Sequence, residues 1–374
     1  MTEAVNAFEP QDSKGRGVRP ALFASSLFLS DYSLYLNRIL IGLADESITV
    51  ALVCPDESEV RSVISPAIEI IRHPAMKLPF LGRLNKNILI EKLKKFRPTV
   101  IHCLCESQAA LAAQVSKQLN LPYLLSINGL SKQTGQLLIS LNRLFNIIAP
   151  SESIAAGIGR NIPSLADRVK LIKMGTFVPS SAASFSRGGR TASIAAACSM
   201  REKTDFGQLL SALKRLAIEG YEFMTIFIGN PASSSDEKGL RSLISALGLS
   251  NIAGIIPRTE PWRDVLSACD IFIEPHKSNF FNPILLEAMS VGTSVAGYKG
   301  VDDLIIENQT AVILDDSDER NIYNSLRRLL DNPEFARDIA VRAQDFVRKN
   351  HTVSEMVCDT IECYRNAQTW NNRR

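Results

Sequence analysis

The feature that most constrains the fold is an alternation of short apolar runs with longer segments of helical periodicity. The short runs are rich in β-branched and aromatic residues and are bounded by polar or turn residues, as buried strands are. The segments between them, such as residues 31–45 and 107–120, repeat apolar residues every three or four positions, which predicts helices with one buried face. Strand and helix in alternation predict an α/β fold with a parallel sheet covered on both sides.

The alternation occurs twice, which predicts two doubly wound domains. In the first series the expected strands lie at residues 21–29, 48–55, 68–73, 99–105, 123–128 and 146–150. In the second they lie at 191–199, 223–230, 252–257, 270–275, 293–298 and 310–315. A length of 374 residues also favours two domains over one. Ligands are expected at the carboxyl ends of the strands, in a cleft between the domains.

The segment between the two series is rich in Gly and Ser and has no periodic apolar face, so it is expected to be a linker. The full expected organisation is a flexible tail at 1–18, a first Rossmann-like domain at 19–175, the linker at 176–191, a second Rossmann-like domain at 192–350, and a final helix at 351–374 that packs back on the first domain.

Composition excludes several classes of protein. The 42 Lys and Arg against 39 Asp and Glu leave a net charge of +3, too small to make nucleic acid the main partner. The 7 cysteines are scattered, which is typical of reduced thiols in a cytoplasmic protein. The run "HCLC" at 102–105 has no second cluster of ligands beside it, so no metal is expected. The polar start of the chain and the absence of a long apolar stretch predict neither a signal peptide nor a membrane span.

A strong helix-start signal lies in "FFNPILLEAMSVGT". Asn282 is a preferred N-cap residue, Pro283 suits the first helical position, and Gly292 can end the helix. The N-terminus of such a helix is expected to present unpaired N–H groups and a partial positive charge, which suit a diphosphate. Glu287, about one turn inside, could bind a neutral polyol such as a ribose, or it could be an ordinary helical acid.

Residues 270–295, which contain this signal, resemble the donor-site segment of the GT4 family of retaining glycosyltransferases (glycosyl transferases group 1), without a gap. Further similarity to the family follows in order along the chain, so that it extends over about residues 20–367. The other similar segments are 97–130, 147–153, 172–179 and 229–252. The resemblance implies the GT-B fold, in which two Rossmann-like domains face each other across a cleft. It makes residues 19–175 the acceptor-side domain and residues 192–350 the nucleotide-sugar-binding domain.

The resemblance also implies a reaction. A nucleotide diphosphate sugar would be the donor, a glycan or lipid-linked molecule the acceptor, and no separate cofactor would be needed. The transition state is oxocarbenium-like and negative charge grows on the leaving diphosphate, so fixed cations and helix dipoles stabilise it. Lys203 matches the family's Lys and Glu287 its ribose-binding Glu. The helix start at Asn282, Pro283 and Ile284 is expected at the diphosphate.

Several family positions are altered in this chain. Asn279 stands in place of the first Glu of the family's acid pair, and Asn128 stands in place of its acceptor-domain His, so these two are the candidate catalytic residues. Cys198 replaces the family's Arg, and Arg201, two residues before Lys203, is a candidate substitute cation.

Glycine positions of the family are altered as well. Phe280 and Asn282 replace the two Gly that flank the family's Phe, and the expected Gly-rich loop near residues 26–34 reads "SLFLSDYSL". His102 matches a strand-end position, where a packing role is at least as well favoured as a functional one. A divergent enzyme with a rebuilt pocket and a non-catalytic relative both fit these departures.

A basic amphipathic segment lies at residues 76–97, "MKLPFLGRLNKNILIEKLKKFR". Its Lys and Arg alternate with Leu, Ile and Phe at helical spacing, and Glu91 is its one acid. Such a segment could bind an anionic membrane surface from the cytoplasmic side. It could equally be a solvated helix that packs its apolar side inward.

The leading hypothesis is therefore a retaining hexosyltransferase-type enzyme of polysaccharide or glycoconjugate biosynthesis. The alternative is a catalytically silent GT-B protein that serves as a partner subunit or binds glycans. A sugar-nucleotide epimerase is a weaker third hypothesis, because the acids and His that it would need in the cleft are not found in the sequence.

Overall fold

We describe the fold from a computed structural model. The described residues are 17–58, 65–74, 82–130, 143–186, 189–197, 206–229, 234–256, 262–274, 277–314 and 318–373. The chain forms two compact units. The N-terminal unit comprises Met1–Lys173 with Val353–Arg374, and the C-terminal unit comprises Met174–Thr352.

The N-terminal unit is built on a sheet of seven strands in the order β3-β2-β1-β4-β5-β6-β7, and all its neighbouring strands are parallel. The strands are β1 Pro20–Phe23, β2 Val50–Pro55, β3 Ile68–His73, β4 Val100–Cys103, β5 Tyr123–Ser126, β6 Leu144–Ala149 and β7 Val169–Leu171. The helices are α1 Ser26–Asp31, α2 Ser33–Asp45, α3 Gly82–Phe96, α4 Ala109–Leu119, α5 Glu152–Asn161 and α12 Val353–Asn372, with 3-10 turns at η1 Glu106–Gln108 and η3 Pro163–Arg168.

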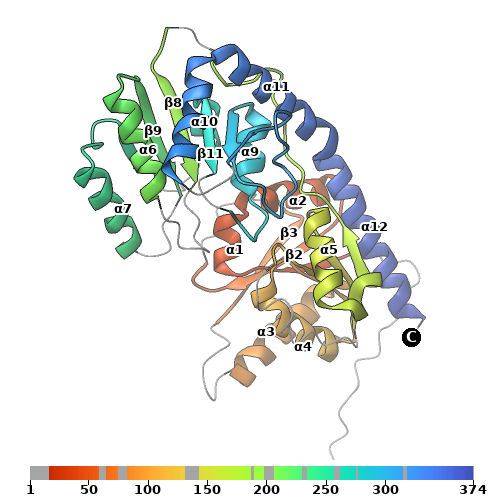
Figure 1. The fold of residues 1–374 in the computed structure, drawn as a ribbon. Coiled ribbons are helices and arrows are strands. Elements are labelled where there is room, and N and C mark those ends of the chain that lie inside the picture. The colour runs from red at the N-terminus through yellow and green to blue at the C-terminus, as the bar shows by residue number, and fades with distance from the viewer. Residues whose placement is uncertain are drawn as a thin grey trace, which may run out of the picture. The chain divides into compact units, whose positions relative to one another are not determined.

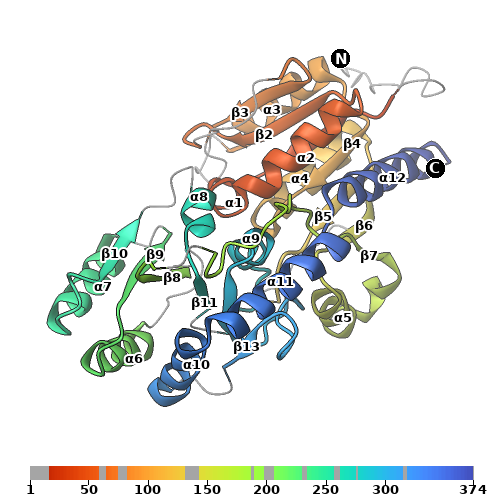
Figure 2. The ribbon, with the colours of Figure 1, turned by 90° about the horizontal axis from the view of Figure 1, so that it is seen from above.

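The last helix, α12, packs within the N-terminal unit. It lies beside α2 and also contacts β4 and β6 (Figure 2). Gly42 of α2 permits this approach, because a Cβ at that position would lie 2.3 Å from the Cγ2 atom of Val357. A side chain at Gly42 would therefore force the two helices apart.

The C-terminal unit has a sheet of six parallel strands in the order β10-β9-β8-β11-β12-β13. Figure 1 shows β9, β8 and β11 of this sheet. The strands are β8 Ala192–Ala197, β9 Phe223–Ile228, β10 Ala253–Ile256, β11 Ile271–Glu274, β12 Ser294–Gly297 and β13 Val312–Ile313. The helices are α6 Gly207–Ile218, α7 Ser234–Ala246, α8 Trp262–Ser267, α9 Pro283–Val291, α10 Glu319–Asp331 and α11 Pro333–Asn350.

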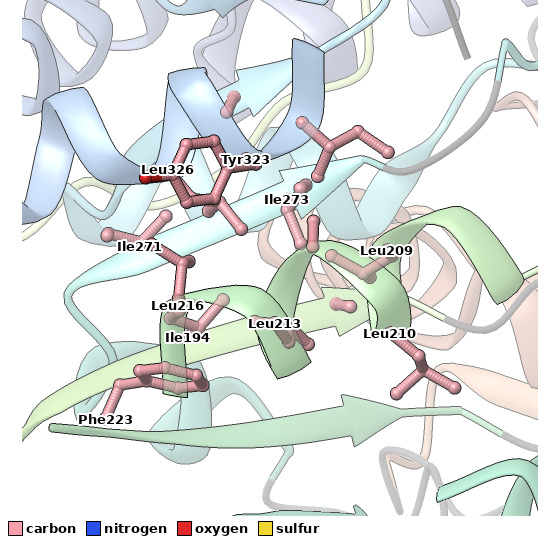
Figure 3. Packing of buried hydrophobic residues seen from close by; sticks show 14 of the residues in the cluster. Ile194, Leu209, Leu210, Leu213, Leu216, Phe223, Ile271, Ile273, Tyr323 and Leu326 are labelled. Carbon is pink, nitrogen blue, oxygen red and sulfur yellow. The ribbon is translucent and has the colours of Figure 1, made fainter. Parts of the chain in front are cut away.

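Two helices close the core of this unit over β8, β9 and β11. Leu209, Leu213 and Leu216 of α6 and Tyr323 and Leu326 of α10 point toward the same sheet face (Figure 3). All five side chains are buried. Each large aliphatic side chain removed from water in this way contributes about 1.5–3 kcal/mol relative to its exposed state. The apolar periodicity of α6 and α10 thus fixes which face each helix turns to the sheet.

The expected fold class, two doubly wound parallel sheets, is confirmed. Two details differ from the prediction. The run at 21–29 is not one strand, because Ser25 caps a new helix by accepting a hydrogen bond from the N–H of Phe28, and α1 begins at Ser26. Strand β7 was not predicted, since three residues are too short for a periodicity to register.

The segment at 176–191 packs on the C-terminal unit. The N–H groups of Ala183 and Ser184 donate to the carbonyls of Val291 and Gly292, at 3.0 and 2.8 Å. Farther along, the buried carboxylate of Asp270 accepts from the N–H of Phe185 and forms an ion pair with Arg190 at 2.7 Å. This Gly- and Ser-rich segment is thus held by specific hydrogen bonds to one unit.

Candidate functional site

Helix α9 begins and ends where the sequence predicts. Asn282 is its N-cap, and its Oδ1 accepts hydrogen bonds from the N–H groups of Ile284 at 2.9 Å and Leu285 at 3.3 Å. Pro283 occupies the first helical position, and Gly292 ends the helix in the left-handed region with φ 75°. A Cβ at Gly292 would lie 2.5 Å from the Cα atom of Ala182, so glycine is required there for packing as well as for the turn.

The expectation of unpaired N–H groups at the start of α9 is wrong for its first turn. Ile284 and Leu285 donate to the Asn282 side chain, Pro283 has no N–H, and Leu286 donates to the Asn282 carbonyl at 3.3 Å. What α9 offers an anion is therefore its partial positive charge. Direct hydrogen bonds from these amides would require the Asn282 side chain to rotate away.

Asn282 also connects α9 to two buried acids. Its Nδ2 donates to Oε2 of Glu274, the last residue of β11, and its backbone N–H hydrogen-bonds the carboxyl group of Asp302. Burial raises the pKa of Asp302 to about 7, although the hydrogen bonds from the N–H groups of Leu304 and Asn282 lower it. The start of α9 is thus held by two acids: Glu274 at the end of β11, and Asp302 in the loop between β12 and β13.

Glu287 is buried and paired with a cation. Its Oε2 lies 2.8 Å from Nε of Arg263, a residue of α8. The same guanidinium donates to Oγ of Ser290 at 3.1 Å and to the carbonyl of Phe177. Arg263 therefore fixes the Glu287 carboxylate and ties α8 and α9 to the segment that precedes β8. A polyol on Glu287 would have to share the carboxylate with this guanidinium.

The loop between β11 and α9, described from residue 277 onward, exposes polar side chains and buries one aromatic ring. Asn279 is exposed, whereas Phe281 is buried. Ser278 bends the loop, since its Oγ accepts from the N–H of Phe280 and donates to the Phe280 carbonyl, both at 3.1 Å. Phe280 is half-buried beside Asn279, at a position where the resemblance implies a glycine.

Asn128, the second candidate catalytic residue, lies at the carboxyl end of β5 in the N-terminal unit. It is buried, its N–H donates to Oε1 of Glu106 at 2.8 Å, and its Nδ2 donates to the carbonyl of Leu104 at 2.8 Å. The side chain thus ties the loop after β5 to the loop after β4. Its amide nitrogen is engaged in this structural hydrogen bond.

His102 has a packing role in the structure. Its Nδ1 lies 2.7 Å from the Tyr364 hydroxyl of α12, and its Nε2 lies 2.8 Å from Oγ of Ser126. Burial lowers the pKa of His102 to about 3, so the ring is neutral at physiological pH. The residue holds α12 against the N-terminal sheet.

Some residues that the resemblance singles out are not described by the structure, and the expected Gly-rich loop is absent from residues 26–34. Lys203, Arg201 and Cys198 lie outside the described residues. The stretch at 26–34 forms α1 and the first turn of α2, so a helix stands where the resemblance implies a Gly-rich loop.

Within the described part of the chain, no group of three His, Cys, Asp or Glu is arranged to hold a metal ion. Over the same residues, no helix combines the length and apolar character that a membrane span needs.

Sequence reasoning missed three side chains of this site: Arg263, Glu274 and Asp302. Glu274 had a visible signal, because it is an acid placed directly at the end of a buried apolar strand. Arg263 and Asp302 had no such signal in the sequence. They approach α9 from other elements, and Arg263 is 24 residues from Glu287 along the chain.

Family comparison agrees with the two-unit division. Residues 194–346 match the family model described as Glycosyl transferases group 1, and residues 26–147 match the model described as Glycosyl transferase 4-like. A comparison with curated protein sequences found no match. The two family matches and the fold together support a glycosyltransferase of the GT-B fold.

Solved structures share the whole architecture at low sequence identity. Anabaena HepE in complex with UDP and glucose is 16% identical with a TM-score of 0.77, and the alignment covers 93% of this chain and 100% of that one. Sucrose-phosphate synthase from Thermosynechococcus elongatus is 16% identical with a TM-score of 0.74, over 94% and 100%. WaaG, a glycosyltransferase involved in lipopolysaccharide biosynthesis, is 12% identical with a TM-score of 0.68, over 92% and 99%.

Proposed function

We propose, from the premise that the chain is a glycosyltransferase of the GT-B fold, that it moves a sugar from a nucleotide diphosphate sugar to a glycan or lipid-linked acceptor. The transfer would retain the anomeric configuration, as in the GT4 family, and would serve polysaccharide or glycoconjugate biosynthesis. The observation that carries the proposal is the start of α9, where a capped helix N-terminus and a buried, oriented carboxylate, Glu287, lie together. UDP in the HepE complex supports a nucleotide as part of the donor.

The proposed roles follow from charge and position. The positive end of α9 at Asn282, Pro283 and Ile284, together with Lys203 and Arg201, would stabilise the diphosphate as negative charge develops on it. Glu287 would accept hydrogen bonds from the ribose hydroxyls, because a carboxylate held by a guanidinium is an oriented acceptor.

Two asparagines, one in each unit, stand in place of charged or titratable residues of the family. Asn279 is exposed and could hold a sugar hydroxyl. An amide keeps the hydrogen-bonding capacity of a Glu but not its negative charge, so it would stabilise an oxocarbenium-like transition state less. Asn128 would act on the acceptor side, although its side-chain amide is already bonded to Leu104.

A second candidate function is a catalytically silent partner subunit or glycan-binding protein. The satisfied amides of α9 favour it, since a diphosphate would have to displace the Asn282 cap to reach them. Removing one electrostatic stabiliser of a transition state commonly costs about a hundredfold to a thousandfold in rate. Several altered positions in one site would leave little catalysis unless the pocket has been rebuilt.

One experiment separates these functions. The protein is titrated calorimetrically with a panel of nucleoside diphosphates and their sugars, and donor hydrolysis and transfer are followed by chromatography. Binding with turnover supports the enzyme, whereas binding without turnover supports the silent protein. If no member of the panel binds, α9 is not a donor site.

A peripheral membrane contact through residues 76–97 forms part of the proposal. Leu89, Leu93 and Phe96 of α3 are buried, so most of the apolar face packs inward. Leu84 and Ile88 are nevertheless 56% and 42% exposed, on a helix rich in Lys and Arg. An exposed apolar stripe beside cations suits the surface of an anionic membrane, where a lipid-linked acceptor would be found.

A further inference from the structure

A pocket of about 530 Å³ lies at the amino edge of the N-terminal sheet. It is lined by residues 17–19, which precede β1, by Ser47 and Thr49, which precede β2, and by residues 95–97, at the C-terminal end of α3. Because the strands are parallel, this edge is opposite the one where Asn128 follows β5. The pocket is therefore separate from the proposed acceptor side of the same unit.

The charge of the pocket has one sign. Three of its lining residues, Arg19, Lys95 and Arg97, are cations, and none of the described residues that line it is an acid. Glu91, one turn before Lys95, forms its ion pair with Lys94 instead, at 2.8 Å. Among the residues that the structure describes, no carboxylate forms an ion pair with any of the three lining cations.

Arg19 is held in a fixed orientation within this pocket. Its Nη2 donates to the Phe96 carbonyl at 2.8 Å, and its guanidinium carbon lies 4.6 Å from the centroid of the Phe96 ring. Its backbone N–H donates to Oγ1 of Thr99 at 2.9 Å, and its Nε is buried without a hydrogen-bond partner. Among the described residues, the side-chain contacts of the guanidinium are thus a carbonyl dipole and a ring face, neither of which carries a full negative charge.

We propose that this pocket binds a phosphate-bearing small molecule or headgroup, at a site distinct from the donor site. Phosphate oxygens accept from guanidinium, ammonium and hydroxyl groups, and Arg19, Lys95, Arg97, Ser47 and Thr49 supply all three kinds of donor. The volume falls within the range of about 300–1,000 Å³ usual for small-molecule sites. The inference does not depend on the proposed glycosyl transfer, because every residue that carries it lies in the N-terminal unit.

The test uses pyrophosphate as the probe, with the full-length protein. Calorimetric titration is done at constant ionic strength. Any binding at α9 is common to all the proteins compared, so a difference between the pocket variant and the control reports the pocket. The pocket variant is Lys95→Gln with Arg97→Gln. The matched control is Lys117→Gln with Arg160→Gln, because both residues are exposed cations in the last turns of helices of the same unit. Equal melting temperatures show that the variants are folded.

We expect wild type and control to bind pyrophosphate alike, and the pocket variant to bind it about tenfold more weakly or worse. Displacement of the protein from phosphatidylserine vesicles by pyrophosphate, in wild type but not in the pocket variant, would identify a lipid headgroup as the source of the phosphate. Binding without such displacement would identify a soluble phosphate compound. The proposal is overturned if wild type does not bind pyrophosphate, or if control and pocket variant weaken equally.

Discussion

At the scale of single residues, Glu287 decides whether α9 serves a nucleotide or only the fold. We predict that Glu287→Ala weakens nucleotide binding by about 1–3 kcal/mol, the scale of a lost charge-assisted hydrogen bond. The same change deprives Arg263 of its carboxylate partner, so Arg263→Gln is the matched control: it breaks the ion pair and keeps the carboxylate. Calorimetric titration with UDP compares the three proteins. A Glu287→Ala variant that binds as tightly as wild type shows that the helix serves only the fold.

Asp302 provides a second test at this scale, through pH. Its carboxyl has a pKa of about 7 in the folded protein against the usual 3.8, so between these values the folded state holds a proton that the unfolded state has lost. The stability linked to this group is fully present below pH 3.8 and is lost as the pH rises to about 7.

The neutral isostere Asp302→Asn should therefore gain stability relative to wild type across that window, by roughly 1 kcal/mol per pH unit. Urea unfolding of both proteins between pH 4 and pH 8 measures the difference. A difference that does not vary with pH would mean that Asp302 is already ionised in the folded protein.

At the scale of elements, the attachment of α12 to the N-terminal sheet depends on a neutral His102. Its pKa is about 3 in the folded state and near 6.5 when unfolded, so between these values the unfolded state binds one more proton. The free energy of unfolding should fall as the pH drops from 6.5 toward 3, by up to about 1.4 kcal/mol per pH unit from this group. Because carboxylates also titrate there, the measured quantity is the difference from His102→Gln, which lacks the titration. Parallel loss of stability in both proteins would contradict the assignment.

Helix α3 is the proposed membrane contact. Its exposed apolar residues can be changed to test this contact without altering the pocket lined by Arg19, Lys95 and Arg97. Leu84→Ser with Ile88→Ser should reduce sedimentation with phosphatidylserine vesicles. The melting temperature should change little, since both side chains are more than two-fifths exposed. Asn87→Ser, another exposed position of α3, is the control. Unchanged sedimentation of the double variant would exclude this helix as the contact.

At the scale of the whole molecule, the spacing of apolar residues along the chain was enough to predict the fold class. Alternating strand and helix patterns predicted both sheets, because buried parallel strands and one-faced helices leave distinct signals in sequence. Residues 26–29 were wrongly predicted as part of a strand, because a short apolar run can form a strand or a helix. The Ser25 N-cap starts a helix there. In the site, the Asn282 cap was local and visible. The Arg263 contact with Glu287 and the Asn282 contacts with Glu274 and Asp302 depend on tertiary packing, so no local pattern reports them.

Whether the whole molecule is an under-equipped enzyme or a silent relative can be tested by restoring the family's residues. Asn279→Glu alone should leave nucleotide affinity nearly unchanged, because that exposed position is proposed to face the sugar. Combined with Asn128→His and Cys198→Arg, it should raise transfer or donor hydrolysis above background if the missing charges are what limits the rate.

The rate is measured with a nucleotide sugar that the titration has shown to bind. The half-buried Phe280 ring supplies the contrasting expectation. If that ring fills the sugar pocket, the triple variant stays inactive and the further change Phe280→Gly restores turnover, since the resemblance implies close backbone approach at this position. A quadruple variant that binds nucleotide and still transfers nothing would favour the silent protein, because the charges and the space for the sugar would both be present.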